Sequence, residues 1–358
     1  MYDARIKRLL ARVQQEGLDA LLITALPNIY YVSGFTGSTA IVLLTPEHRW
    51  FLTDFRYHEQ FKAQVDPSFE LFDNSGKKLL DEVLPELPNQ EALKRIGFES
   101  MDVRHVLYAK MQEHEGREFV PTKEWVAELR MIKDDVEIGR LRESVRLNER
   151  VFIETLDAIQ PGATEADLAA EIYYRAMKYG ASALSFDPII ASGTNSAKPH
   201  AGFTKSKLVP NAPLTIDMGL ILDGYCSDMT RTVFIKDCPK EWQEVYAVVQ
   251  EAKELAFAAI KPGKTGREID AIAREHIYSA GFAGKFEHGL GHGVGIEVHE
   301  SPRLAKSEER TLVAGHVVTD EPGIYLPGEG GVRIEDMIVV TDSGAENLNT
   351  LDTDLLVI

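Results

Sequence analysis

The spacing of apolar residues in the first part of the chain alternates between helical and strand periods, which predicts a mixed α/β domain. Residues 3–16 form a predicted amphipathic helix that ends at Gly17, and residues 56–65 form a second predicted helix. Short apolar runs predict strands at residues 18–25, 39–45, 50–55 and 94–100. This part of the sequence contains no obvious cluster of catalytic residues.

A long, highly charged helix is predicted over residues 133–159, and Pro161 and Gly162 follow it. Its buried stripe is predicted to contain Val136, Leu141, Val145, Val151 and Ile153. We place a domain boundary just before this helix. A length of 358 residues also suggests two domains, so we expect an N-terminal domain of residues 1–130 and a C-terminal domain of residues 131–358.

The second half of the sequence contains an internal repeat, in which residues 159–181 align without gaps to residues 260–282. The coincident pairs, each 101 residues apart, are Pro161 and Pro262, Gly162 and Gly263, Thr164 and Thr265, and Gly180 and Gly281. In each copy the threonine can cap the start of a helix and the last glycine can end it. A chance match between two amphipathic helices is the weaker alternative. We therefore expect two related helix-and-strand units, packed about a pseudo-twofold axis with a site between them.

Two aspartates of the first unit lie on a predicted β-hairpin. Asp223 and Gly224 are a strong signal for a type I′ turn. This turn sets a register in which Asp217 lies opposite Thr230, and Asp228 projects from the same face because strand side chains alternate. The two carboxylates are then diagonal neighbours, roughly 7–8 Å apart at the backbone. They repel each other unless a positive charge lies between them.

Two glutamates of the second unit lie on another predicted hairpin. A turn centred on Gly328 places Glu321 directly opposite Glu335, and Arg333 projects from the same face as Glu335. Arg333 is therefore a candidate partner for the acidic cluster or for a substrate. Burying unpaired charge is very costly. Four carboxylates in apolar segments thus favour a pair of divalent cations, with His292 joining them from the glycine-rich segment between the hairpins.

Four carboxylates and one imidazole suit Mn²⁺, Co²⁺, Fe²⁺ or Zn²⁺, and two such ions can share bridging carboxylates. The predicted metal ligands are Asp217, Asp228, His292, Glu321 and Glu335. Asp320 should face the other side of its strand, so it is not among them. Cys226, two residues before Asp228, could add a thiol ligand or line the pocket, and we favour packing.

Three histidines, His288, His292 and His299, fall within twelve residues that also contain four alternating glycines. The glycines argue against a helix and let the backbone approach a ligand closely. A phosphate-binding loop is the rival interpretation, which is disfavoured because no P-loop lysine follows and no GxGxxG pattern is present. His200 lies in a loop before the first hairpin and, taken alone, would be an ordinary loop histidine.

Composition narrows the classes of partner. A formal net charge of −17 argues against nucleic acids and anionic membranes, because both are bound by basic surfaces. The acidity is interpreted mainly as an aid to solubility. Two cysteines in 358 residues do not indicate a disulfide framework. No apolar run approaches the roughly 18 residues that span a bilayer, and the charged N-terminal segment is unlike a signal peptide, so a cytoplasmic location is expected.

Five strings resemble the proline-specific metallopeptidases aminopeptidase P and Xaa-Pro dipeptidase, or prolidase: "KPHAG", "DMGLILDGYCSDMTRT", "HGLGHGVGIEVHE", "EPGIY" and "GVRIED". The larger group also contains methionine aminopeptidase and creatinase. Upstream, "NIYYVSGFTGS" and "LTDFRY" are similar to the creatinase-type N-terminal domain. The resemblance implies an α/β, or α+β, architecture. It consists of a small creatinase-like N-terminal α/β domain and a pita-bread domain with an internal pseudo-twofold repeat.

By this resemblance the five predicted ligands hold two divalent ions, of which Mn²⁺ is typical and Co²⁺ or Zn²⁺ are alternatives. The residues implied to act in catalysis are Glu321, His200, His288, His299 and Arg333. The implied reaction is hydrolysis of the bond between an N-terminal residue and proline, by a homodimer. The alternatives are a methionine-aminopeptidase-like or broader-specificity metalloaminopeptidase, and a metal-free binding module on the same scaffold. The sequence leaves open whether the substrate is an Xaa-Pro dipeptide or a longer peptide.

Overall fold

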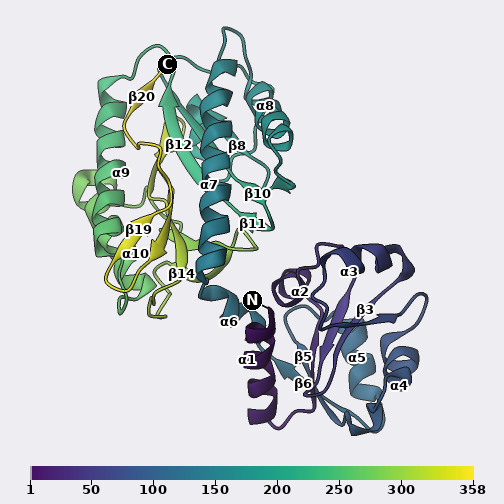
Figure 1. Cartoon of the computed structure of the whole chain (residues 1–358). Coiled ribbons are helices and arrows are strands. Elements are labelled where there is room, and N and C mark those ends of the chain that lie inside the picture. Colours follow the sequence, from purple (N-terminus) through teal and green to yellow (C-terminus); the bar gives the residue numbers. More distant parts are fainter. Residues whose placement is uncertain (1) are drawn as a thin grey trace. The chain divides into compact units, whose positions relative to one another are not determined.

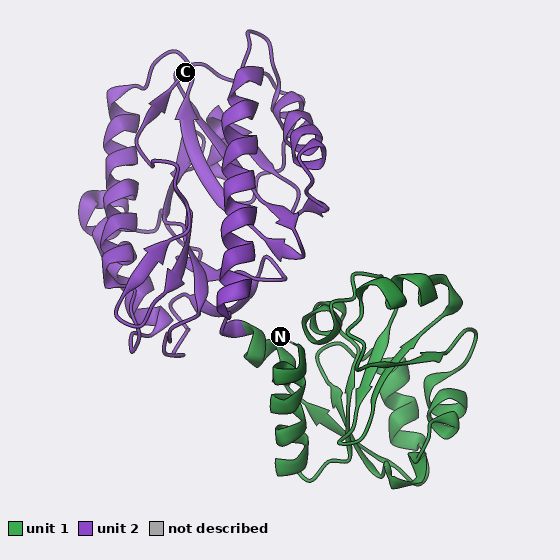
Figure 2. Ribbon diagram, viewed as in Figure 1, with its two compact units in different colours: residues 1–130 green, residues 131–358 purple. Residues whose placement is uncertain are grey.

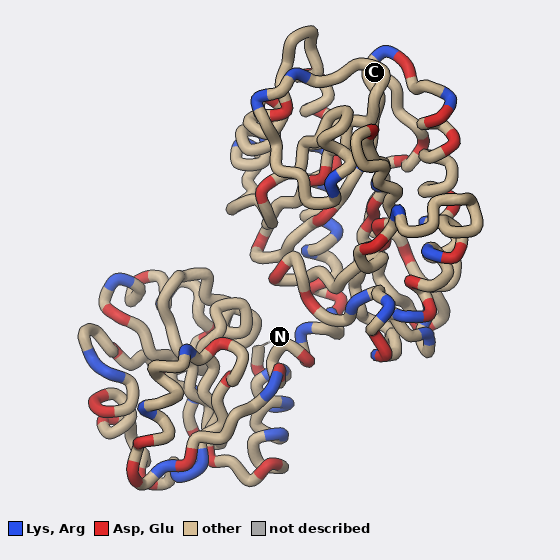
Figure 3. The backbone as a smooth tube through the Cα atoms, turned by 180° about the vertical axis from the view of Figure 1, so that it is seen from behind, with Lys and Arg blue, Asp and Glu red and all other residues tan. Residues whose placement is uncertain are grey.

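The computed structural model describes residues 2–358 of the chain. Its contacts divide the chain into two compact units, residues 1–130 and residues 131–358 (Figure 1, Figure 2). Basic and acidic residues are interspersed along the backbone of each unit (Figure 3), so the acidic surplus is not gathered in one segment. Among residues 2–358, no helix combines the length and the apolar composition that a membrane span requires.

The first unit is built around a six-stranded sheet in the order β4-β3-β2-β1-β5-β6. The strands are β1 (Ala20–Ile23), β2 (Ile41–Leu44), β3 (Arg49–Thr53), β4 (Glu70–Asp73), β5 (Arg95–Glu99) and β6 (Glu118–Thr122). The helices are α1 (Tyr2–Gln15), α2 (Leu26–Ser33), α3 (His58–Gln64), α4 (Leu84–Glu86), α5 (His105–Glu113) and α6 (Trp125–Met131). β2 pairs antiparallel with β1 and β3, and the other neighbouring strands are parallel. The four predicted strands and both predicted helices of this unit are confirmed.

The second unit carries the predicted site. Its helices are α7 (Asp135–Thr155), α8 (Glu165–Lys178), α9 (Lys240–Ala259) and α10 (Gly266–Ile277). Its sheets have the orders β20-β12-β9-β8, β14-β13-β15-β18-β19, β11-β10-β7 and β16-β17. The strands of the first half are β7 (Ala183–Leu184), β8 (Ile189–Ser192), β9 (Pro213–Met218), β10 (Leu220–Leu222), β11 (Tyr225–Cys226) and β12 (Met229–Phe234). Those of the second half are β13 (Gly291–Gly293), β14 (Glu300–Leu304), β15 (Val317–Asp320), β16 (Gly323–Leu326), β17 (Gly330–Arg333), β18 (Asp336–Val340), β19 (Ala345–Asn347) and β20 (Leu356–Val357).

The two halves of the second unit repeat one another. In each half a helix pair precedes three strands that pair in succession: α7, α8, β8, β9 and β12, then α9, α10, β13, β15 and β18. Thr164 and Thr265 cap α8 and α10 through equivalent capping boxes. Gly180 and Gly281 lie beyond the ends of those helices with φ of 100° and 96°. Each half has its own buried hydrophobic cluster. The repeat predicted from the sequence is therefore confirmed.

The buried stripe of α7 differs from the prediction at both ends. Three of the five predicted residues are buried, but Val136 is 53% exposed and Ile153 is 50% exposed. Phe152 is buried in place of Ile153. An α-helix turns by about 100° per residue, so Phe152 projects within about 20° of Leu141, whereas Ile153 projects about 120° away from it. The prediction chose the wrong one of two adjacent apolar residues.

Two polar residues on the buried face attach α7 to the strands of the first hairpin. Asn148 Nδ2 donates to the carbonyl of Met218 at 2.9 Å, and Ser144 Oγ donates to the carbonyl of Leu220 at 3.1 Å. Both side chains are buried, so these bonds satisfy groups that would be costly to leave unpaired. They hold α7 against the backbone that directly follows Asp217.

Candidate metal centre

The first hairpin has the predicted geometry. Asp223 and Gly224 have φ of 49° and 78°, and a type I′ turn requires positive φ at both central residues. Asp217 on β9 pairs with Thr230 on β12, as predicted. Asp228 directly precedes β12, and its side chain is buried. The turn chemistry therefore decides which residues of this hairpin face one another.

The second hairpin also has the predicted register. The pairs β15-β18 and β16-β17 share one register about Gly328, which has a φ of 84°. Between the two pairs lies a short stretch with Glu321 and Pro322 on one side and Glu335 on the other. Since the register continues across this stretch, Glu321 lies opposite Glu335. Pro322 interrupts the ladder because it has no N–H to donate.

His292 lies among the acidic residues of both hairpins. Asp228, His292 and Glu335 each bring one potential ligand atom to within 4.8 Å of the others. His292 Nε2 lies 3.6 Å from Asp228 Oδ2 and 3.4 Å from Glu321 Oε1. Its Nδ1 lies 3.0 Å from the carbonyl oxygen of Gly293, which can only accept, so we assign the ring proton to Nδ1. The lone pair of Nε2 is then available to a cation.

Asp217 contributes a fourth carboxylate. Its Oδ2 accepts a hydrogen bond of 2.6 Å from Arg333 Nη2. Its Oδ1 is buried and has no hydrogen-bond partner among the described residues. A buried acceptor without a donor is costly, and a cation at this atom would remove that cost.

Burial is the main influence on the ionisation of the cluster. It raises the pKa of Asp228 and Glu335 well above the usual range, and the neighbouring carboxylates add to the effect. Burial also raises the pKa of Glu321 to about 8 and lowers the pKa of His292 to about 4. The centre thus combines carboxylates that are costly to ionise alone with a neutral imidazole. This donor set fits divalent cations such as Mn²⁺, Co²⁺ or Zn²⁺, whose charge would offset the repulsion.

A chain of hydrogen bonds borders the cluster. Arg333 Nη1 donates to Tyr325 Oη at 2.9 Å, and Tyr325 Oη lies 2.9 Å from His288 Nε2. Burial raises the pKa of Tyr325 to about 12 and lowers the pKa of His288 to about 4. Sequence reasoning missed Tyr325. Its one signal is its position on β16, the strand that pairs with the strand of Arg333.

Two threonines that sequence reasoning did not assign to the site hold the ligand carboxylates in place. Thr230 Oγ1 donates to Glu335 Oε2 at 2.7 Å. Thr319 Oγ1 donates to Glu321 Oε1 at 3.1 Å and accepts from the His292 N–H at 3.0 Å. Each threonine is two residues from an acidic residue on its own chain segment. The period of two was therefore the signal that could have found them.

The remaining predicted histidines are exposed residues at the edge of the cluster. The ring centroid of His299 lies 4.3 Å from that of His292. His200 follows Pro199, whose carbonyl accepts from Arg333 Nη1 at 3.1 Å. Both histidines are exposed. The structure therefore brings the predicted ligands and the predicted catalytic residues into one region.

Cys226 is a packing residue in this structure. Its side chain is buried, and its Sγ donates to the carbonyl of Ile296 at 3.4 Å. Burial raises the pKa of the thiol to about 12, whereas a metal ligand must be a thiolate. These observations agree with the interpretation favoured from the sequence.

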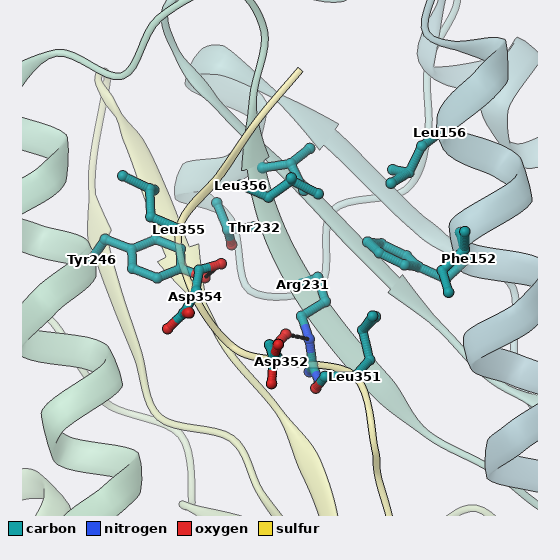
Figure 4. A pocket seen from close by; sticks show the side chains of 12 residues that line it. Phe152, Leu156, Arg231, Thr232, Tyr246, Leu351, Asp352, Asp354, Leu355 and Leu356 are labelled. Carbon is teal, nitrogen blue, oxygen red and sulfur yellow. Dashed lines mark hydrogen bonds between the residues drawn. The ribbon is translucent and has the colours of Figure 1, made fainter.

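A separate hollow of about 260 Å³ lies where α7, β12, α9 and the C-terminal segment meet (Figure 4). Its lining is mainly apolar and includes Phe152, Leu156 and Leu355, with Arg231 and Asp352 as polar members. None of the predicted site residues lines this hollow. It is therefore distinct from the candidate metal centre.

The duplicated unit and its acidic, histidine-containing centre fit a metallopeptidase, which is the class of protein that the sequence model matching residues 139–342 gives. The chain belongs to Metallopeptidase family M24, whose sequence model matches residues 139–342. Residues 5–132 match the Creatinase/Prolidase N-terminal domain. The family and the fold class predicted from the sequence are thereby confirmed.

Similar proteins cover nearly the whole chain. A solved Xaa-Pro dipeptidase from Bacillus anthracis is 36% identical, with a TM-score of 0.94 and coverage of 100% of both chains. A solved X-Pro aminopeptidase from Thermotoga maritima is 37% identical, with a TM-score of 0.92 and coverage of 99% of both chains. The "Uncharacterized peptidase YqhT" of Bacillus subtilis is 40% identical over 346 residues, which are 96% of this chain and 97% of the relative.

Proposed function

We propose that this chain is a metal-dependent peptidase that hydrolyses the bond between an N-terminal residue and a following proline. The observation that carries the proposal is the buried cluster of four carboxylates and one imidazole, drawn from both halves of the duplicated unit. Membership of the metallopeptidase family supports the reaction class. Proline specificity is supported by the names of two solved relatives, a Xaa-Pro dipeptidase and an X-Pro aminopeptidase.

The proposed cofactor is a pair of divalent ions, with Mn²⁺ as the expected metal and Co²⁺ or Zn²⁺ as alternatives. The proposed ligands are Asp217, Asp228, His292, Glu321 and Glu335. When bound, such ions lower the pKa of water and polarise a carbonyl group. Four carboxylates balance the charge of two dications, which explains why so many acidic groups can be buried together.

Glu321 is the proposed general base. Its side chain is 17% exposed, compared with 6% for Asp228 and 10% for Asp217, so water and substrate reach it more readily. The amide bond before a proline is tertiary and has no N–H, so its nitrogen must gain a proton as it leaves. Glu321 would accept a proton from the attacking water and deliver it to that nitrogen.

The histidines and Arg333 have separate proposed roles. His299 or His200, at the exposed edge, would donate a hydrogen bond to the oxygen on which negative charge develops. His288 would contact the substrate, with its ring held by Tyr325. Arg333 would keep Asp217 ionised and in place. The histidines would thus contact the substrate, and the buried arginine would support the metal ligands.

A homodimer and a cytoplasmic location are also proposed, from the family resemblance. Light scattering on the purified full chain tests the oligomer, and a mass of twice 39.9 kDa is expected. A monomeric mass at micromolar concentration would refute the dimer without affecting the assignment of the centre. Fractionation of the source cells tests the location, and recovery of the protein with the membranes would refute it.

The decisive experiment measures metal content and substrate choice together. Protein purified without chelators is analysed for metal, stripped, and then restored with Mn²⁺, Co²⁺ or Zn²⁺. Each form is tested on an Xaa-Pro dipeptide, an Xaa-Pro-Yaa tripeptide and a matched Xaa-Ala dipeptide. We expect stoichiometric metal and cleavage of proline peptides in preference to Xaa-Ala. The ratio of dipeptide to tripeptide cleavage identifies the substrate length.

Two outcomes would replace the proposal. Faster cleavage of Xaa-Ala or Met-Ala peptides than of proline peptides would indicate a methionine-aminopeptidase-like or broader enzyme. Purified protein without stoichiometric metal and without peptidase activity after metal is restored would indicate a binding module.

A further inference from the structure

Arg231 joins both hairpins behind the candidate metal centre. It lies on β12, three residues after Asp228, and is 3% exposed. Its Nη1 donates to the carbonyl of Glu335 at 2.6 Å and to the carbonyl of Thr230 at 3.0 Å. Its Nη2 donates to Asp336 Oδ1 at 2.8 Å. One guanidinium thus contacts the two chain segments that carry Asp228 and Glu335.

The same guanidinium holds the C-terminal segment. Arg231 Nη2 donates to the carbonyl of Leu351 at 2.8 Å, and Nε donates to the carbonyl of Asp352 at 3.3 Å (Figure 4). All three nitrogen atoms of the side chain are therefore hydrogen-bonded. Because a guanidinium is planar and rigid, it fixes the distances between the oxygen atoms that accept its hydrogen bonds.

Lys253, on α9, forms a second ion pair with Asp336. Asp336 Oδ2 lies 2.5 Å from Lys253 Nζ and accepts from Asn347 Nδ2 at 2.8 Å. Lys253 and Arg231 thus both form ion pairs with Asp336, but Arg231 also donates to the backbone of Glu335. Comparing these two cations can separate the effect of a buried ion pair from the effect of the link to Glu335.

Glu335 is held at three of its atoms. Its N–H donates to the carbonyl of Thr230 at 3.1 Å, and its Oε2 accepts from Thr230 Oγ1 at 2.7 Å. Its carbonyl oxygen accepts from Arg231. Asp228 precedes β12, whereas Glu335 precedes β18, and these strands belong to different sheets. β12 and β18 do not pair with each other, so a strand ladder does not set the separation of these two carboxylates. The hydrogen bonds of Glu335 with Thr230 and Arg231 set it instead.

We propose that Arg231 is a positioning residue, which sets the separation of the Asp228 and Glu335 carboxylates and thereby determines how tightly the centre binds divalent cations. This inference rests on the proposed function of the same site. Removal of groups that orient metal ligands from outside commonly weakens metal binding about 10- to 100-fold. Arg231→Lys keeps a positive charge beside Asp336, but an ammonium group cannot reproduce the planar fork. It is therefore the informative variant.

The test measures Mn²⁺ binding by isothermal titration calorimetry, on the metal-stripped full chain. The wild type, Arg231→Lys and Lys253→Met are compared, and urea unfolding of each metal-free protein is recorded. Lys253→Met is the matched control because it removes the other buried cation of Asp336. We expect Arg231→Lys to weaken Mn²⁺ binding about 10-fold or more. Lys253→Met should lose at least as much stability while its Mn²⁺ affinity stays near that of the wild type.

The outcomes separate this inference from the proposed function. If Arg231→Lys binds Mn²⁺ as tightly as the wild type does, the inference about Arg231 is overturned but the proposed function is not. The proposed function is tested separately, because Mn²⁺ binding and Xaa-Pro cleavage by the wild type are measured in parallel. An equal loss of affinity in both variants would also overturn it, since the effect would then belong to the Asp336 ion pair. Absence of Mn²⁺ binding by the wild type would overturn both proposals. If Arg231→Lys does not fold, the double variant Arg231→Gln/Asp336→Asn is compared with Asp336→Asn alone. A further loss of Mn²⁺ affinity of about 10-fold in the double variant is expected, and equal affinities in the two variants would overturn the inference.

Discussion

Arg333 donates a hydrogen bond of 2.6 Å to Asp217, and only 4% and 10% of the two side chains are exposed. One of the four carboxylates in the cluster therefore has a cationic partner within the chain itself. Arg333 Nε also donates to Thr230 Oγ1 at 3.2 Å, and Thr230 in turn donates to Glu335. Asp217 and Glu335, which come from different hairpins, are thus connected through the Arg333 guanidinium and the Thr230 hydroxyl.

Loss of this arginine should affect both stability and activity. We expect Arg333→Met to lower the free energy of unfolding of the metal-free protein by roughly 3–5 kcal/mol, because it leaves Asp217 buried and unpaired. We expect cleavage of an Xaa-Pro dipeptide to fall by about 10- to 100-fold, because Arg333 orients a proposed metal ligand. Arg142→Met is the control, since its 2.7 Å pair with Glu346 is partly exposed and should contribute less than about 1 kcal/mol. Similar urea midpoints for the two variants would contradict this account.

Metal binding should stabilise the fold. Divalent cations offset the repulsion within the cluster, so Mn²⁺ added to stripped protein should raise the melting temperature, by the equivalent of about 2.7 kcal/mol at 100 times the dissociation constant. Asp228→Asn should abolish this gain and lower the metal content together with the activity. Asp223→Asn, at the exposed turn of the same hairpin, keeps a residue that suits a type I′ turn and should respond as the wild type does. Full activity and metal content in Asp228→Asn would refute its assignment as a ligand.

The buried face of α7 gives a third prediction. Phe152 is 2% exposed, whereas its neighbour Ile153 is 50% exposed. Phe152→Ala should therefore cost about 3 kcal/mol or more in the free energy of unfolding, and Ile153→Ala less than about 1 kcal/mol. Urea unfolding of both variants checks this order. A larger loss of stability in Ile153→Ala than in Phe152→Ala would show that Ile153 is the buried residue, as in the predicted stripe.

The positions of the ligands on one face of each hairpin could be predicted, because hairpin geometry depends on local sequence. The turn at Asp223 and Gly224 and the turn about Gly328 each set a strand register. Strand alternation then decides which side chains share a face. The local sequence alone therefore places Asp217 opposite Thr230.

The hydrogen-bond partners within the site could not be predicted in this way. Asp217 and Arg333 come from hairpins that lie roughly a hundred residues apart in sequence, and their contact depends on how the two hairpins pack. The contact between Tyr325 and His288 also depends on tertiary packing. The wrong choice of Ile153 over Phe152 has a different cause, because helical phase alone places Phe152 close to Leu141 and Ile153 well away from it, so the sequence did contain the signal.

Acid sensitivity at His316 gives a fourth prediction. Its side chain is buried, and its Nδ1 accepts a hydrogen bond from the Val313 N–H at 3.3 Å. Burial, and then the charges of Lys133 and Arg310, lower the pKa of His316 to about 4 from a usual value of 6.5. Below pH 6.5 the unfolded chain therefore binds a proton that the folded chain does not. Stability should fall as the pH drops from about 6.5 to about 4, by up to roughly 3 kcal/mol.

The substitution His316→Asn removes this titration but keeps an acceptor in place of Nδ1. We expect the variant to be less stable than the wild type at pH 7, where the native ring is well packed, and to lose less stability between pH 6.5 and pH 4.5. Urea unfolding at several pH values measures each slope. Parallel slopes for the wild type and His316→Asn would show that His316 is protonated as readily in the folded chain as in the unfolded one.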